Sequence, residues 1–109
     1  MNHPRSMPRF KRRMRIRYRD DGGDKEMVAL TRDVSPTGLG VNANRPAPLG
    51  AHLQLSLEVD DEQPIPLTGR VVWVRRVPAG MLSVEQGGFG VQLTSADERW
   101  YSYIAEIAA

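Results

Sequence analysis

Short runs of alternating apolar and polar residues, separated by turns rich in glycine and proline, are the feature that most restricts this fold. Between residues 13 and 19, Met14, Ile16 and Tyr18 share one parity and arginines occupy the other, which predicts a half-buried strand with a basic outer face. Further β-rich runs cover residues 27–34, 38–44, 52–59, 67–77 and 81–94. So many strand edges in a small mass favour closure into a barrel.

The last fifteen residues change to a helical period. Ser95 is followed three residues later by Glu98, which predicts a capping box at a helix start. Trp100, Tyr103 and Ile104 then recur at helical spacing, and Ile107 continues the stripe, so we expect Trp100 in the core. The predicted fold is all-β: a small antiparallel β-barrel followed by one C-terminal α-helix.

Length and composition indicate one soluble domain. At 109 residues, with 40% hydrophobic and 26% charged residues, the chain resembles an ordinary globular protein with one modest core. It contains no cysteine, which excludes disulfides and thiolate metal sites. No apolar run approaches the ~20 residues of a membrane span, and no signal peptide is visible, so we expect a cytoplasmic protein. Residues 1–8 predict a flexible tail, followed by a domain over residues 9–109.

Charge is distributed unevenly along the chain. Residues 1–19 carry eight Lys or Arg and no acid, whereas the remainder carries seven basic and thirteen acidic residues. A basic N-terminal segment of this kind is expected to bind phosphate, an acidic partner, or the acidic residues in the rest of the same chain.

Two motifs could form a binding site. The first is the arm from Arg9 to Arg19, because the planar guanidinium bonds phosphate in bidentate fashion and also matches O6 and N7 of guanine. The second is the turn at residues 33–40, where Asp33 and Ser35 can bond backbone or ligand, and Gly38 can take a positive φ or admit a flat ligand. Each motif alone is more often a solvated arm or a satisfied turn.

Catalysis and metal binding have little support in the sequence. His3 and His52 offer no base paired with a nucleophile, and no catalytic motif is present. The acids at 60–62 fit a solvated turn better than a metal site. We therefore expect neither an enzyme nor a metalloprotein.

Taken together, the blocks resemble the PilZ domain family. They are Arg9–Arg13, Asp33–Gly38, Gly69–Arg75, the return strand at 87–91 and the closing helix from Ser95. The resemblance extends from about Arg9 to Ile107. It implies a six-stranded β-barrel with a C-terminal helix. In many members it also implies a receptor for the bacterial second messenger cyclic di-GMP, linked to motility, biofilm or secretion.

The resemblance also implies roles for individual residues. Arg9 and Arg13 would clamp the guanine edges and phosphates of cyclic di-GMP, with Arg12 as the alternative second arginine. Asp33 and Ser35 would bond a guanine's polar edge, and Gly38 would leave space for the base. No cofactor is implied besides this ligand, and an unidentified downstream protein would receive the signal.

Trp73 has two interpretations. It could stack on a guanine as an aromatic platform. However, it shares strand parity with Leu67, Val71 and Val77, and this parity favours a place in the core.

Two other functions remain open from the sequence. One is a PilZ-like adaptor that works through protein contacts without nucleotide. The other is weak nonspecific binding of nucleic acid through the arm, which is disfavoured because the acidic body would repel a long polyanion.

Overall fold

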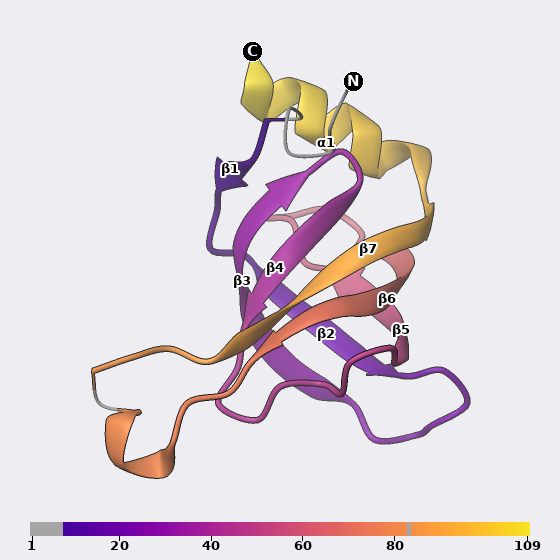
Figure 1. Cartoon of the computed structure of the whole chain (residues 1–109). Helices are drawn as coiled ribbons and strands as arrows, with labels where there is room; N and C mark the ends of the chain where they lie inside the picture. The colour runs from indigo at the N-terminus through magenta and orange to yellow at the C-terminus, as the bar shows by residue number, and fades with distance from the viewer. Residues whose placement is uncertain (1–7, 83) are drawn as a thin grey trace, which may run out of the picture.

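The computed structural model describes residues 8–82 and 84–109 and consists of strands followed by one helix (Figure 1). The predicted flexible tail at 1–8 lies outside the described residues except for Pro8, and remains a prediction. The strands are β1 (Phe10–Lys11), β2 (Arg15–Asp20), β3 (Met27–Ser35), β4 (Gly38–Asn42), β5 (His52–Leu57), β6 (Ile65–Arg75) and β7 (Gly88–Ala96), and the helix is α1 (Glu98–Ala108).

Six of these strands close into an antiparallel barrel, as predicted. The order around the ring is β3-β2-β5-β6-β7-β4, and β4 pairs again with β3. β3 closes the ring because residues 27–30 pair with β2 while residues 30–35 pair with β4. The two-residue β1 lies outside this ring and pairs with β3 alone.

The interior is filled by the apolar side chains at alternate positions of the strands. The helix α1 covers one end of the barrel (Figure 1). Ile16 and Tyr18 of β2 are buried while the intervening arginines point outward, as the alternation predicted. Trp100 is fully buried, which confirms its expected place in the core, and its Nε1 donates to the carbonyl of Pro36 at 3.2 Å. This bond ties the helix to the turn between β3 and β4.

The helix starts differently from the prediction. Ser95 lies in β7 and pairs with Thr68, so its backbone is committed to the sheet. Asp97 is the N-cap instead, and its side chain accepts from the backbone N–H of Arg99 at 2.9 Å. The capping box at Ser95 was therefore wrong, because the β6–β7 ladder continues two residues further than the sequence pattern suggested.

The return strand is also shorter than predicted. β7 begins at Gly88, and Met81, where the strand was predicted to begin, lies in a 3₁₀ helix (Ala79–Met81) instead. Local backbone bonds replace the ladder here, since the N–H of Met81 donates to the carbonyl of Pro78 at 2.8 Å.

The basic arm is held against β3 by one buried threonine. Phe10 pairs with Val34 and Arg15 pairs with Leu30, so residues 12–14 form an irregular segment between β1 and β2. The Thr31 hydroxyl donates to the carbonyl of Arg12 at 2.6 Å and accepts from the N–H of Met14 at 2.9 Å. Because Thr31 is fully buried, these bonds fix where the arm leaves the barrel.

Candidate functional site

A row of four residues crosses the outer face of the barrel. Asp33 of β3 pairs with Gly40 of β4, Gly40 pairs with Gly90 of β7, and Gly90 pairs with Trp73 of β6. A Cβ on Gly40 would lie 2.7 Å from Oδ1 of Asp33, and a Cβ on Gly90 would collide with the indole of Trp73. Asp33 and Trp73 thus lean over glycines of the neighbouring strands. We call this row of Asp33, Gly40, Gly90 and Trp73 the ledge.

Two arginines bind the carboxylate of the ledge. Nη2 of Arg9 lies 2.6 Å from Oδ1 of Asp33, and Nε of Arg32 lies 3.6 Å from Oδ2. The guanidinium of Arg32 also lies over the Trp73 ring, 5.0 Å from its centroid, in cation–π geometry. Charged donors, a carboxylate and an aromatic face therefore occupy one continuous surface.

Trp73 lies on this surface and not in the core, so the prediction from its parity was wrong. The β6–β7 register shifts between Val71 and Trp73, which places one extra residue in β6. Val71 faces the core before the shift, and Val74, opposite Phe89, packs against the core after it. The irregularity turns the half-buried indole outward, and a count of alternate positions cannot detect it.

Ser35 and Gly38 form the turn beside the ledge. The Ser35 hydroxyl lies 3.2 Å from both the N–H and the carbonyl of Gly38, and it is buried. Gly38 does not have the positive φ that was considered for it. A Cβ on Gly38 would instead meet the carbonyl oxygen of Val91, so close approach of β7 accounts for this glycine. Gly38 also lines a groove of about 280 Å³ together with Arg9 and Trp73.

The glycines that floor the ledge were missed from the sequence. Gly40 lies at the end of the 33–40 block and Gly90 lies in the return strand at 87–91, and neither was assigned a role in the site. Their alternation with buried Leu39, Val41, Phe89 and Val91 places Gly40 and Gly90 on the outer face. The signal was present, but it became specific only once the pairing of β4 with β7 was known.

Arg12 and Arg13 lie in a neighbouring groove, apart from the ledge. Lys11, Arg12, Arg13, Arg32, Asn42 and Gln86 line this groove, which measures about 560 Å³ and which we call the arm groove. Arg32 joins the two areas, because it lines the arm groove and also contacts Asp33 and Trp73. The structure therefore brings Arg9, Asp33, Ser35 and Gly38 together and leaves Arg13 beside them.

Comparison with protein-family models identifies the family of this chain. The family model described as PilZ domain matches residues 2–107. This chain belongs to the PilZ domain family. PilZ domains generally act as receptors for cyclic di-GMP. They are typically ligand-binding or adaptor domains without catalytic activity.

One solved structure shows the same PilZ fold. The Bacillus subtilis inhibitor of motility, MotI/DgrA, superposes with a TM-score of 0.75 at 14% sequence identity. The match covers 97% of this chain and 50% of that protein, so this PilZ chain spans about half its length. No curated protein matches the sequence.

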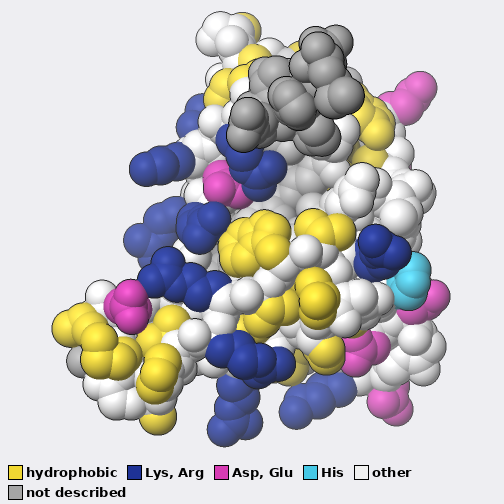
Figure 2. Space-filling view, in the orientation of Figure 1, with side chains coloured by type: hydrophobic (Ala, Val, Ile, Leu, Met, Phe, Trp, Pro, Cys, Tyr) yellow, Lys and Arg dark blue, Asp and Glu magenta, His cyan; other side chains and the backbone are white. Residues whose placement is uncertain are grey.

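Basic side chains of the PilZ domain gather on one side of the molecule. In Figure 2, Lys and Arg side chains form a band beside β1 and β3 that continues towards the loop between β6 and β7. Within the described ranges, Lys11, Arg12 and Arg13 have no acid at ion-pair distance. Among the described residues, the Arg12 guanidinium donates to the carbonyl of Lys11, at 2.9 Å. These three charges are available to an anion.

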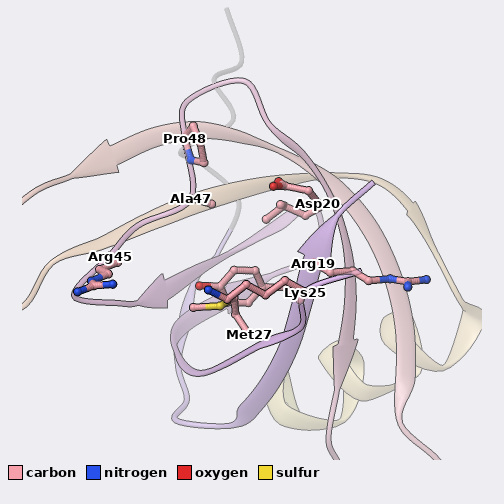
Figure 3. Close-up of a pocket in the computed structure, with 9 residues that line it drawn as sticks. Arg19, Asp20, Lys25, Met27, Arg45, Ala47 and Pro48 are labelled. Carbon is pink, nitrogen blue, oxygen red and sulfur yellow. The ribbon is translucent and has the colours of Figure 1, made fainter. Parts of the chain in front are cut away.

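A second cavity of the PilZ domain lies away from these residues. It measures about 170 Å³, and its lining includes buried Tyr18 and Leu53 (Figure 3). Arg45 and Arg19 lie on opposite sides of Lys25 and Met27 in this view. Burial raises the pKa of Tyr18, and the nearby charge of Asp20 raises it further. None of the predicted site residues lines this cavity.

The described part of this PilZ domain contains no candidate metal site. No three His, Asp or Glu side chains of residues 8–82 and 84–109 come together in a way that could hold a metal ion. His52 is exposed at the start of β5, and His3 lies outside the described residues. The one described helix is too short to cross a membrane.

Proposed function

We propose that this PilZ domain binds cyclic di-GMP across the ledge and the arm groove and relays the signal to a partner protein. The observation that carries the proposal is the contact of Arg9 with Asp33 beside a glycine-floored surface that ends at Trp73. Guanine requires donors for O6 and N7, acceptors for its N–H groups and a flat surface for its ring. The ledge supplies the acceptor and the flat surface, and Arg9 supplies the donor beside it.

Each residue has a role in the proposed complex. The Asp33 carboxylate accepts from a guanine N–H edge, while Arg9 donates to O6 and N7. Ser35 keeps the turn closed through its bonds to Gly38, which positions Gly38 in the lining of the groove. Trp73, with Arg32 stacked on it, is a candidate platform for the second base or for the other face of the same base.

The phosphates are assigned to the arm. Arg13, with Arg12 as the alternative, lies in the arm groove, where Lys11, Arg12 and Arg13 have no acidic partner among the described residues and only Arg32 pairs with Asp33. A charged hydrogen bond to phosphate contributes about 1.5–3 kcal/mol. Several such bonds, less the cost of ordering the arm, are enough for micromolar affinity.

The relay begins at the base of the arm. The Tyr103 hydroxyl of α1 contacts the sulfur of Met14, the residue that Thr31 holds against β3. Movement of residues 9–13 around a ligand therefore reaches the helix directly. A downstream protein that contacts both the arm and α1 would sense the bound state, in the cytoplasm where a second messenger acts.

Calorimetric titration with cyclic di-GMP tests the proposal. We expect saturable heat with a Kd in the micromolar range or lower, and a rise in melting temperature because only the folded state binds. Arg9→Ala and Arg13→Ala should each weaken binding at least tenfold. Arg19→Ala is the matched control, because Arg19 of β2 bonds Gln54 of β5. Loss in Arg12→Ala with retention in Arg13→Ala would move the phosphate contact to Arg12.

The same titration separates the two rival functions. Absence of heat at about 100 μM ligand, together with an unchanged melting temperature, would reject the receptor and favour a PilZ adaptor without nucleotide. Binding of single-stranded DNA or RNA with steep salt dependence and no base preference would favour nonspecific nucleic-acid binding instead.

A further inference from the structure

The loop between β6 and β7 carries apolar side chains far from the core. Its described residues are 76–82 and 84–87, and Figure 1 shows it extending from the barrel at the end opposite α1. Met81 is 43% exposed and Val84 is 72% exposed, and no other described large hydrophobic residue is more exposed than Val84. We call Met81, Leu82 and Val84 the apolar tip.

The backbone of the tip bonds within the loop. The N–H of Met81 donates to Pro78, and the N–H groups of Val84 and Glu85 both donate to the carbonyl of Met81, at 3.0 and 2.9 Å. A segment with internally satisfied amides can enter a less polar medium without leaving these donors unpaired. The N–H groups of Met81, Val84 and Glu85 therefore already have partners inside the loop.

Positive charge surrounds the base of the loop. Arg75 neutralises Glu85 at 2.8 Å, and Arg76 has no ion pair with any described acid. Gln86 of the loop lines the arm groove, which brings Lys11, Arg12, Arg13 and Arg32 next to the loop. Figure 2 shows the basic band meeting the apolar side chains of the loop. The acids at 20–24 and 60–62 belong to other loops.

We propose that this face docks on an anionic lipid bilayer, with the apolar tip entering the headgroup boundary and the surrounding cations contacting lipid phosphates. A projecting tip of a few apolar side chains with a basic collar complements a deformable, negatively charged surface. An acidic protein would need a pocket to receive the same tip. This inference does not rest on the binding of cyclic di-GMP.

Vesicle flotation of the full chain without nucleotide tests the proposal. We expect binding to vesicles in which about a third of the lipid is phosphatidylglycerol, little binding to pure phosphatidylcholine, and release as salt is raised. No binding to the anionic vesicles, or equal binding to both kinds, would overturn the proposal.

Substitutions in the loop test whether the apolar tip is responsible for binding to the vesicles. Val84→Asp and Met81→Asp should each reduce vesicle binding about tenfold or more, and Arg76→Glu several-fold. The matched control is Tyr101→Asp, because Tyr101 is 53% exposed on α1 at the opposite end of the molecule. Equal losses in Val84→Asp and Tyr101→Asp would also refute the assigned face.

Two further measurements exclude trivial causes. Circular dichroism and thermal melting should show that the Asp variants remain folded, since the replaced side chains are exposed. Calorimetry with cyclic di-GMP should give the parent affinity for Val84→Asp. Loss of vesicle binding with unchanged affinity for cyclic di-GMP would show that the loop acts independently of the nucleotide site. The two proposals can therefore fail separately.

Discussion

The arginine-rich run from Arg9 to Arg19 has two halves with different surroundings. On β2, Arg15 lies 3.4 Å and Arg17 lies 2.9 Å from Glu58, and Arg19 bonds Gln54. On the arm, Lys11, Arg12 and Arg13 have no acid within ion-pair distance in the part of the chain that the structure describes. The comparison shows that the two halves differ in their acidic neighbours and not in the presence of arginines. Arg9 is the exception on the arm, because it pairs with Asp33.

The difference follows from strand pairing. β2 lies between β3 and β5, so its outer face meets polar side chains from both sides, including Glu26 before β3 and Glu58 after β5. The hydrogen bonds that Arg17 donates to Glu26, and then to Glu58, raise the pKa of Arg17. β1 pairs with β3 alone, and residues 12–14 leave the ladder. Among the described residues, Lys11, Arg12 and Arg13 therefore lack the acidic neighbours that surround Arg15 and Arg17.

The largest expected effect is on nucleotide affinity. Arg13→Ala should weaken cyclic di-GMP binding by about 10- to 100-fold, because a charged bond to phosphate is lost, while Arg17→Ala should leave it unchanged. Calorimetry of both variants measures the ratio. Equal losses would mean that the two halves act as one diffuse positive surface, and the distinction between them would fail.

The second effect concerns the residue that holds the arm in place. Thr31→Val keeps the shape of the side chain but leaves the Arg12 carbonyl and the Met14 N–H without their partner. We expect a loss of about 2 kcal/mol in the free energy of unfolding, measured in urea. Thr94→Val is the control, because the exposed Thr94 hydroxyl bonds only Thr68 and its loss should cost little. Similar losses at both positions would contradict a special role for Thr31.

A smaller effect is expected on thermal stability. Arg17→Ala should lower the melting temperature slightly at low salt, since it removes contacts to Glu26 and Glu58, and the deficit should shrink as salt is added. Arg13→Ala should melt like the parent protein. A larger deficit for Arg13→Ala would show that the arm is already paired within the folded chain.

The smallest effect is on tyrosine ionisation. Burial raises the pKa of Tyr103, and the charge of Arg12 opposes this shift, so Arg12→Ala should raise the pKa slightly further. Tyr18, which has no contribution from Arg12, should not change. For both tyrosines the folded pKa exceeds the unfolded value, so their stabilising contribution is complete below about pH 10 and declines as pH rises above it. NMR titration of the two rings would test this, and an equal response in both would contradict the assignment.

Much of the barrel could be predicted from alternation, because inward residues such as Ile16, Tyr18 and Leu55 obey a strict period of two. The failures share one physical cause. Ser95 was assigned to a helix cap and Trp73 to the core because the sequence does not show where a partner strand continues or shifts register. Gly90 was not recognised as a floor for the same reason. The roles of Arg9 and Asp33 came from family resemblance, and the structure adds that they are in contact.

The register shift in β6 has a consequence for comparing relatives. One additional residue next to Val72 decides whether an indole faces solvent or the interior. A shortening of β6 by a single position would turn that ring towards the interior and remove one end of the ledge, although every motif residue would still be present. Alignments of this family should therefore be inspected for length at this position as carefully as for residue identity.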